Sequence, residues 1–297
     1  MGTRIRLGTA LAAVAVVLSG TLAACGAQDD SVDEGAKVTK VVFGDDPANY
    51  GMLHLPAGEG PFPVVVMVHG GGWVQQQDLS YFEPLSESIA EHDVAVWNIE
   101  YRRVGGAGGW PTTLADADDA TEALAGPVQE AAHGRLDLDR VHVAGHSAGG
   151  HLAAWIVGRH TLPPGSPGHQ PEIRAQGAVI MAGVFDPALA ATNGHDQFVR
   201  NLIGGLPEEY PDRYAVASPI EHLPIGTPVT AMHGTADETV DPAQSRSYVK
   251  AASAAGDRPR LMMIEGAGHA DFGNIDSKAW AEAEQVILDQ VDSDRAG

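Results

Sequence analysis

The chain has 297 residues, of which 44% are hydrophobic and 19% are charged. This much apolar material can close a sizeable core around one large domain, and the composition excludes an intrinsically disordered protein. The 18 Lys and Arg residues stand against 39 Asp and Glu residues, and a net charge of −21 repels nucleic-acid backbones, so we exclude a nucleic-acid partner.

The first 24 residues have the pattern of a bacterial lipoprotein signal peptide. Arg4 and Arg6 precede an apolar stretch, and Leu22–Cys25 reads LAAC, which resembles the lipobox whose cysteine receives a lipid. We therefore predict an exported protein that a lipid on Cys25 anchors to the outer face of the bacterial cytoplasmic membrane. A plain secretory signal and an uncleaved membrane span are the alternatives.

The mature chain is predicted to have a polar, flexible tether over residues 25–36 and one folded domain over residues 37–297. Cys25 is the only cysteine, so no intrachain disulfide can form. In the folded part, short β-branched runs alternate with longer helical stretches, which predicts an α/β protein with a mostly parallel, eight-stranded sheet covered by helices on both faces. The predicted strands are Lys37–Phe43, Tyr50–Leu55, Pro63–His69, Val94–Ile99, Val141–Ala144, Ala178–Met181, Val229–Met232 and Leu261–Ile264. The predicted helices are Leu79–His92, Thr113–Ala132, Ala148–His160, Pro242–Ala255 and Ser277–Val291.

A glycine-rich loop follows the third predicted strand. His69–Trp73 reads HGGGW, which resembles the HGGG-type motif of α/β-hydrolase esterases. The resemblance implies that the N–H groups of Gly71, Gly72 and Ala148 form an oxyanion hole. The alternatives are a purely structural turn and a phosphate loop, but no Gly-Lys-Ser/Thr sequence follows. We expect His69 to be a structural residue of the loop.

The clearest chemical motif is Gly145–Gly149, which reads GHSAG and matches G-x-S-x-G. An apolar strand precedes it and an apolar helix follows, so Ser147 is predicted to lie on a strained strand-to-helix turn as a nucleophile. Taken alone, such a glycine-rich turn can also be structural. Trp73 and His146 are candidate residues of the substrate pocket, as is His151 on the other side of the nucleophile. The alternative is that Trp73 packs against the glycine turn and that the two histidines serve packing and local hydrogen bonds.

The segment of residues 183–225 is longer than a plain connection between two strands requires, and it is rich in proline and aromatic residues. We predict that it forms a small cap or lid.

Two later loops supply an acid and a base. Asp237 follows the strand VTAM in the sequence HGTADETV, and His269 ends the sequence EGAGH after the last predicted strand. The chain order Ser, Asp, His is the order expected of α/β-hydrolases. The imidazole can accept the proton of Ser147, and the carboxylate can orient the imidazole. Asp241 is the competing acid, although its place before a helix suits an N-cap.

With these motifs, residues 60–290 resemble the α/β-hydrolase superfamily, in particular esterases and lipases of the hormone-sensitive-lipase-like and formamidase-like (BD-FAE-type) groups. The resemblance implies a serine hydrolase with the triad Ser147, Asp237 and His269, which cleaves a small ester or amide through an acyl-serine intermediate and needs no cofactor. No H-E-x-x-H motif is present, so we predict no metal. Arylformamidase or amidase activity of the kynurenine-formamidase type, a peptidase, and a non-catalytic ligand-binding lipoprotein are the alternatives. The sequence does not indicate an oligomeric state.

Overall fold

The computed structural model describes residues 36–193 and 196–293. Its centre is one sheet of eight strands in the order β1-β2-β4-β3-β5-β6-β7-β8. β1 and β2 pair antiparallel with their neighbours, whereas the strands from β3 to β8 are all parallel. The strands are β1 (Lys37–Val42), β2 (Tyr50–Leu55), β3 (Phe62–Val68), β4 (Ala95–Ile99), β5 (Leu136–His146), β6 (Gly177–Met181), β7 (Val229–Gly234) and β8 (Arg260–Ile264).

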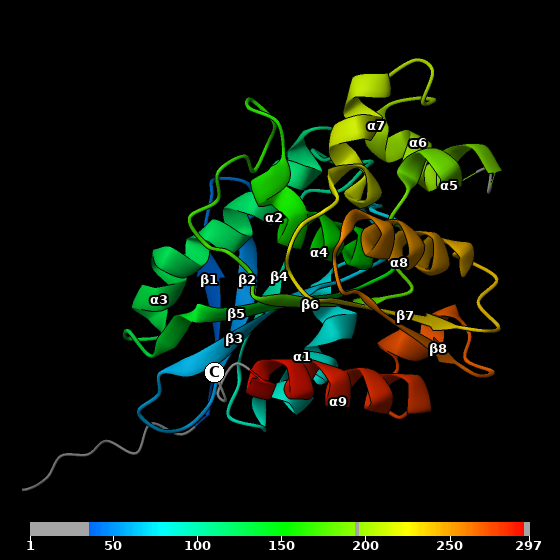
Figure 1. Cartoon of the computed structure of the whole chain (residues 1–297). Coiled ribbons are helices and arrows are strands. Elements are labelled where there is room, and N and C mark those ends of the chain that lie inside the picture. The colour runs from blue at the N-terminus through cyan, green and yellow to red at the C-terminus, as the bar shows by residue number, and fades with distance from the viewer. Residues whose placement is uncertain (1–35, 194–195, 294–297) are drawn as a thin grey trace, which may run out of the picture. The chain divides into compact units, whose positions relative to one another are not determined.

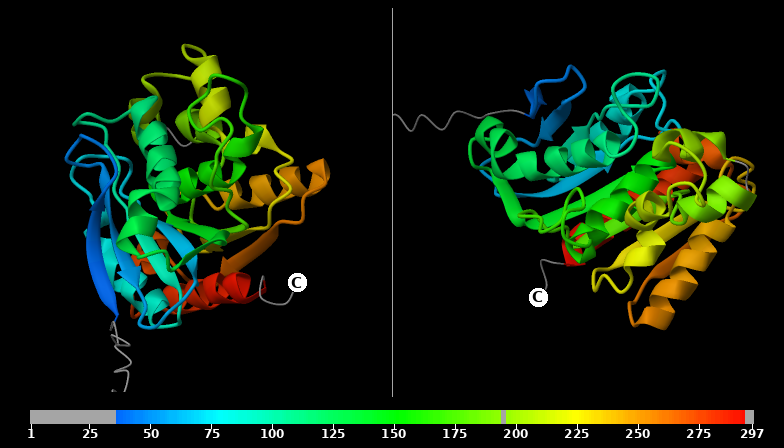
Figure 2. Two further views of the ribbon diagram at one scale, coloured as in Figure 1. Left: turned by 90° about the vertical axis from the view of Figure 1, so that its left-hand side faces the viewer. Right: turned by 90° about the horizontal axis from the view of Figure 1, so that it is seen from above.

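Helices cover both faces of the sheet, as Figures 1 and 2 show. The strand β3 explains why, because every residue of its sequence FPVVVMV is buried. Val64, Val66 and Val68 belong to one hydrophobic cluster, and Val65 and Met67 belong to the other. One face is covered by α1 (Glu83–Ala90) and α9 (Lys278–Ser293), and the other by α2 (Thr112–Glu122), α3 (Pro127–Ala131), α4 (Ala148–Gly158) and α8 (Ala243–Ala255).

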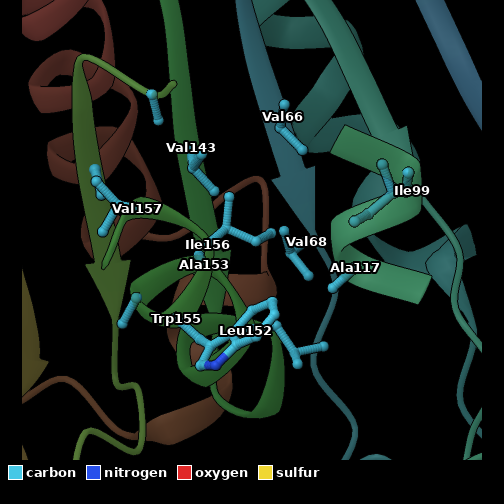
Figure 3. Packing of buried hydrophobic residues seen from close by; sticks show 14 of the residues in the cluster. Val66, Val68, Ile99, Ala117, Val143, Leu152, Ala153, Trp155, Ile156 and Val157 are labelled. Atoms are coloured by element: carbon cyan, nitrogen blue, oxygen red, sulfur yellow. The ribbon is translucent and has the colours of Figure 1, made fainter. Parts of the chain in front are cut away.

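The helix α4 is the most deeply enclosed helix, because all of its residues are buried. Figure 3 shows its Leu152 and Ile156 packed beside Val68 of β3 and Val143 of β5. Burying a side chain of this size stabilises the fold by about 1.5–3 kcal/mol. The apolar contacts hold α4 firmly on the sheet, and its N-terminus is therefore held at the end of β5.

The eight predicted strands are all present, with β5 longer than predicted at both ends. The prediction of one helix over residues 113–132 is wrong. The chain forms α2, a 3₁₀ turn (Ala123–Ala125) and α3, because Gly126 takes φ −126° and ψ −109° before Pro127 starts a new helix. The predicted helix over residues 79–92 begins as a 3₁₀ turn, η1 (Leu79–Phe82), before α1.

The segment of residues 183–225 connects β6 to β7 and carries three short helices that were not located from the sequence. They are α5 (Pro187–Asn193), α6 (Gln197–Ile203) and α7 (Pro211–Ala217), followed by the 3₁₀ turn η4 (Pro219–His222). Figure 1 shows them beyond α4 and α8, and η4 contacts both of those helices. Asp196 caps α6 by accepting the N–H groups of Phe198 and Val199.

The predicted signal peptide, Cys25 and the predicted tether except Ala36 lie outside the described residues. Within residues 36–193 and 196–293, no helix combines the length and the apolar character that crossing a bilayer requires.

Candidate active site

Ser147 lies on the sharp turn between β5 and α4. Its backbone angles, φ 57° and ψ −119°, are rare for any residue other than glycine. Two glycines make room for the turn, because a Cβ on Gly145 would lie 2.3 Å from the Gly149 oxygen and one on Gly149 would lie 2.0 Å from the Val68 oxygen. The Ser147 N–H donates to the Met181 oxygen at 2.9 Å. The turn is thus held by its neighbours, and it places the serine at the N-terminus of α4.

The hydroxyl of Ser147 joins His269 and Asp237 in one hydrogen-bonded chain. Ser147 Oγ lies 2.8 Å from His269 Nε2, and His269 Nδ1 lies 2.8 Å from Asp237 Oδ2. The other carboxylate oxygen accepts the N–H groups of Thr239 at 2.8 Å and Val240 at 2.9 Å. Three residues from the β5–α4 turn, the loop after β7 and the 3₁₀ turn η5 (His269–Gly273) therefore meet. Because Nδ1 donates to the carboxylate, Nε2 has a lone pair that can accept the serine proton.

A second histidine, His233, also contacts the carboxylate of Asp237. Its Nε2 lies 2.9 Å from the Val240 oxygen and 3.2 Å from Asp237 Oδ2, while Nδ1 lies 2.8 Å from the Ser245 hydroxyl. Because the Val240 carbonyl can only accept, Nε2 carries the proton. Burial by itself would raise the pKa of Asp237, but hydrogen bonds from His233, His269 and the Val240 N–H outweigh it and lower the pKa below its ordinary value. The carboxylate is therefore charged at neutral pH, and it can stabilise a positive charge that develops on His269.

Asp241, the competing acid, takes no part in the hydrogen bonds that join Ser147, His269 and Asp237. Its Oδ1 accepts the Ala243 N–H at 2.8 Å, but the N-cap residue of α8 is Pro242, so Asp241 lies one residue before the cap position that the sequence predicted for it. Among the described residues, the two ring nitrogens of His269 bond to Ser147 and Asp237. The geometry therefore favours Asp237 as the partner of the imidazole.

The glycine loop after β3 faces the serine turn. Gly71 and Gly72 have φ values of 102° and 62°, which glycine adopts without strain. A Cβ on Gly70 would lie 3.0 Å from the Cβ of Ser147, so the loop and the turn are in direct contact. In the part of the chain that the structure describes, the N–H groups of Gly71, Gly72 and Ala148 donate to no protein acceptor. Unpaired N–H groups beside a serine can bind a negatively charged oxygen.

His69 supports the glycine loop from within the protein. Its Nδ1 lies 2.8 Å from the Gly70 oxygen and its Nε2 lies 3.0 Å from Glu100 Oε1. Its ring stacks on Tyr101 with centroids 4.4 Å apart, and the Tyr101 hydroxyl donates to the His69 oxygen at 2.9 Å. The side chain is fully buried and makes only structural contacts, as predicted.

A pocket of about 950 Å³ opens onto Ser147. Trp73 and His146 both line it, whereas His151 is not a lining residue and is buried with its Nε2 2.7 Å from the Ala217 oxygen. None of its described lining residues is Lys or Arg. Part of the wall comes from the segment of residues 183–225, namely Val184, Leu189, Ala190, Asn193, Asp196, Gln197 and Phe198. Over the described residues, no group of three or more His, Cys, Asp or Glu side chains could hold a metal ion.

A protein-family model and several known proteins match this chain. The BD-FAE model matches residues 53–251, which is more than half of the sequence. The chain belongs to the BD-FAE family. Among relatives of this BD-FAE chain, Esterase LipC of Mycobacterium tuberculosis (strain ATCC 25618 / H37Rv) is 29% identical, over 86% of this chain and 66% of its own length. The probable isoprenylcysteine alpha-carbonyl methylesterase ICMEL1 of Arabidopsis thaliana is 25% identical, over 78% of this chain and 50% of its own length. The chain thus spans about half to two thirds of these relatives.

Solved structures share the architecture of this BD-FAE chain. The esterase Est2 of the Planctomycetes species Thermogutta terrifontis, with propionate bound, is 26% identical with a TM-score of 0.67, over 87% of this chain and 94% of that chain. A truncated carbohydrate esterase from gut microbiota is 19% identical with a TM-score of 0.72, over 88% of this chain and 98% of that chain. At this identity, the likeness supports the fold but not the activity. The BD-FAE chain has the α/β-hydrolase fold, which confirms the fold predicted from the sequence.

Three residues of the site were not predicted from the sequence. His233 opens the HGTAD motif at the end of β7, and its place at the carboxyl end of a parallel strand was a usable signal. Tyr81 contacts the glycine loop through its hydroxyl, and Phe198 places its ring 3.1 Å from where a Cβ on Gly72 would lie. Neither Tyr81 nor Phe198 belongs to a recognisable motif, because both reach the site through contacts between distant segments.

Proposed function

We propose that this chain is a serine hydrolase that cleaves carboxylic esters through an acyl-serine intermediate. The observation that carries the proposal is the chain of hydrogen bonds from Asp237 through His269 to Ser147. Ser147 and His269 line the pocket, beside N–H groups that have no acceptor among the described residues. A buried carboxylate, an oriented imidazole and a strained serine turn have one shared chemical use, which is to make the hydroxyl a nucleophile.

In the first step, Ser147 Oγ attacks the ester carbonyl carbon while His269 Nε2 takes the hydroxyl proton. The imidazole becomes positively charged, and the Asp237 carboxylate stabilises that charge through the 2.8 Å hydrogen bond to Nδ1. The carbonyl oxygen becomes negative and binds the N–H groups of Gly71, Gly72 and Ala148. Removing one such donor typically costs about 100- to 1,000-fold in kcat.

In the second step, the tetrahedral intermediate collapses and the bond to the leaving alcohol breaks. His269 gives its proton to the departing oxygen, which leaves the acyl group on Ser147. Water then attacks the acyl-serine, with His269 as general base, and the carboxylic acid is released. No step draws on a metal or a cofactor.

The names of the relatives support an ester as the substrate. LipC and Est2 are esterases, and other solved structures of Est2 hold it phosphorylated by paraoxon or phosphonylated by sarin. We expect an organophosphorus probe to label the present chain in the same way, on Ser147.

The decisive test is hydrolysis of p-nitrophenyl acetate by wild type and by Ser147→Ala. We expect the variant to keep the wild-type circular dichroism spectrum and melting temperature but to lose turnover and labelling by a fluorophosphonate probe. Wild-type-like turnover in Ser147→Ala would overturn the assignment. An inactive wild type that the probe does not label would instead favour a non-catalytic ligand-binding protein.

We also propose that the chain is exported and that a lipid on Cys25 anchors it to the membrane. The basic residues Arg4 and Arg6, the apolar stretch after them and the sequence LAAC support this. In a bacterial host fed an alkyne fatty acid, wild type should carry the label and sediment with membranes, whereas Cys25→Ser should do neither. Equal labelling of the two proteins would contradict the proposal.

A further inference from the structure

A second chain of hydrogen bonds joins the glycine loop to the segment that carries His269. The Gly70 N–H donates to the Tyr81 hydroxyl oxygen. That oxygen lies 3.4 Å from His146 Nδ1, and His146 Nε2 lies 2.9 Å from the backbone oxygen of His269. The residues come from the loop after β3 and the nearby η1, from the end of β5 and from η5, so three stretches that are distant in the sequence are connected.

The direction of each hydrogen bond follows from the chemistry of the groups. The His269 carbonyl can only accept, so the proton of His146 must be on Nε2, and Nδ1 is left with a lone pair. The Gly70 N–H occupies a lone pair of the Tyr81 oxygen, so the Tyr81 O–H is free to donate to Nδ1. Burial raises the pKa of Tyr81, which therefore keeps its proton at neutral pH.

His146 stays uncharged at neutral pH because its ring is buried among other rings. Its side chain is buried, its ring centroid lies 4.7 Å from that of His269, and Phe82 and Phe272 lie on its other sides. Burial, and secondly the nearby His269, lower the pKa of His146 to about 3. The ionisable groups that face or surround it are Tyr81, His269, Asp237 and His233. A neutral ring at this place does not repel the imidazolium that forms on His269 during turnover.

We propose that Tyr81 and His146 are positioning residues that keep the oxyanion loop and the general base in one fixed geometry. This inference rests on the proposed function. It assigns a task to the residue before the nucleophile beyond lining the pocket. Ser147, His269 and the donors at Gly71 and Gly72 must act on the same carbonyl group, and a displacement of about 1 Å can cost about 100-fold in rate.

Four variants test the proposal through kcat and KM on p-nitrophenyl acetate. Tyr81→Phe keeps the ring and removes the hydroxyl, and we expect kcat to fall about 10-fold or more with KM nearly unchanged. His146→Ala should lose at least as much. His146→Gln should recover part of the loss, because its amide N–H can reach the His269 oxygen. Tyr214→Phe is the matched control, since it removes a hydroxyl that donates to the Gly205 oxygen at 2.8 Å away from the pocket, and its kcat should stay within about twofold of wild type.

The double variant Tyr81→Phe/His146→Ala separates a connected chain from two independent packing roles. If the two residues act as one unit, the double variant should be no slower than His146→Ala. Independent roles would give losses in kcat that multiply. Loss of melting temperature with unchanged kcat per folded molecule would mean that the residues serve stability alone and would overturn the proposal.

A measurement that does not use activity keeps the inference distinct from the proposed function. Nitrogen-15 NMR of the histidine rings should show wild-type His146 as the neutral tautomer protonated at Nε2 from about pH 5 to about pH 8. A ring that is protonated at Nδ1, or that becomes charged in this range, would refute the chain of hydrogen bonds even in a fully active enzyme. An inactive wild type with the expected NMR signature would instead refute the esterase proposal and leave the hydrogen-bonded connection standing.

Discussion

Gly149→Ala should lower both turnover and stability. Gly149 lies in the first turn of α4, and a Cβ on it would lie 2.0 Å from the Val68 oxygen and 2.3 Å from the His69 oxygen. Both obstacles are backbone atoms where the glycine loop leaves β3, so no side-chain rotation can relieve the clash. The methyl group has to push the start of α4, which carries the Ala148 N–H, away from that loop.

The size of the effect follows from these contacts. Real Cβ atoms essentially never come within 3.0 Å of another heavy atom, so the two backbones must separate by about 1 Å. Overpacking of this kind costs about 1–3 kcal/mol, and backbone obstacles place it at the upper end. The helix propensity of Ala returns about 1 kcal/mol. We therefore expect a net loss of about 2 kcal/mol, a melting temperature lower by about 4–8 °C, and a kcat about 100-fold lower.

Thermal unfolding and p-nitrophenyl acetate kinetics, corrected for the folded fraction, measure the two effects. Gly158→Ala is the matched control at the other end of α4, where a Cβ would meet the Ile225 methyl group at 3.3 Å. Its melting temperature and kcat should stay near wild type. Gly149→Ala with wild-type values for both would refute the steric reasoning. A lowered melting temperature with unchanged kcat would refute the link from α4 packing to the oxyanion geometry.

Three further predictions concern charge. Asp237→Asn should lower kcat on p-nitrophenyl acetate about 10³- to 10⁴-fold, because the amide no longer holds the imidazole of His269 in the required tautomer. Asp241→Asn is the control and should keep kcat within about twofold. Equal losses in the two variants would contradict the choice of Asp237. Burial lowers the pKa of His146 to about 3 and that of His151 to about 4 from an ordinary 6.5. The unfolded chain therefore binds more protons, so the free energy of unfolding should be highest above pH 6.5 and should fall towards pH 4 by at most about 1.4 kcal/mol per pH unit for each histidine. Denaturant unfolding should show a shallower decrease in His151→Gln, and an identical slope would contradict this. The net charge of −21 should repel an anionic substrate. An ester with a carboxylate on its leaving group should therefore have a kcat/KM several-fold below that of an uncharged isostere at low ionic strength, and the difference should shrink at about 0.5 M salt. A preference for the anionic ester would contradict this.

The centre of the sheet could be predicted from the sequence because several of its parallel strands are short, apolar and buried over their whole length. The run VVVMV in β3 cannot form a solvent-facing strand, and the parallel strands β4 and β6 have the buried sequences AVWNI and GAVIM. Ser147, Asp237 and His269 could be chosen because each follows a strand of this sheet at its carboxyl end. The sequence does not show that their side chains lie within hydrogen-bonding distance of one another, and only the structure does.

The rest of the site depends on contacts that no local pattern contains. The helices α5, α6 and α7 have only seven residues each, so they do not produce the repeated apolar spacing by which helices are recognised. Asp196 as a cap and Gly204 with φ 103° mark both ends of α6, but such residues are equally common in loops. Tyr81 contacts the Gly70 N–H, and His233 contacts the Asp237 carboxylate. Which loops lie close enough for such contacts depends on the order of the strands in the sheet.

Part of the pocket wall lies on a stretch of the chain that carries none of the proposed reactive groups. Ser147, Asp237, His269 and the glycine loop each follow a strand, whereas seven lining residues lie on the single connection between β6 and β7, namely Val184, Leu189, Ala190, Asn193, Asp196, Gln197 and Phe198. An insertion, a deletion or an exchange within that connection can therefore reshape what enters the pocket without disturbing how a bound carbonyl is attacked. The preferences of such a protein can therefore change through the replacement of one short segment. An engineer can do the same by transplanting residues 184–197 between relatives while keeping Phe198, whose ring lies against Gly72.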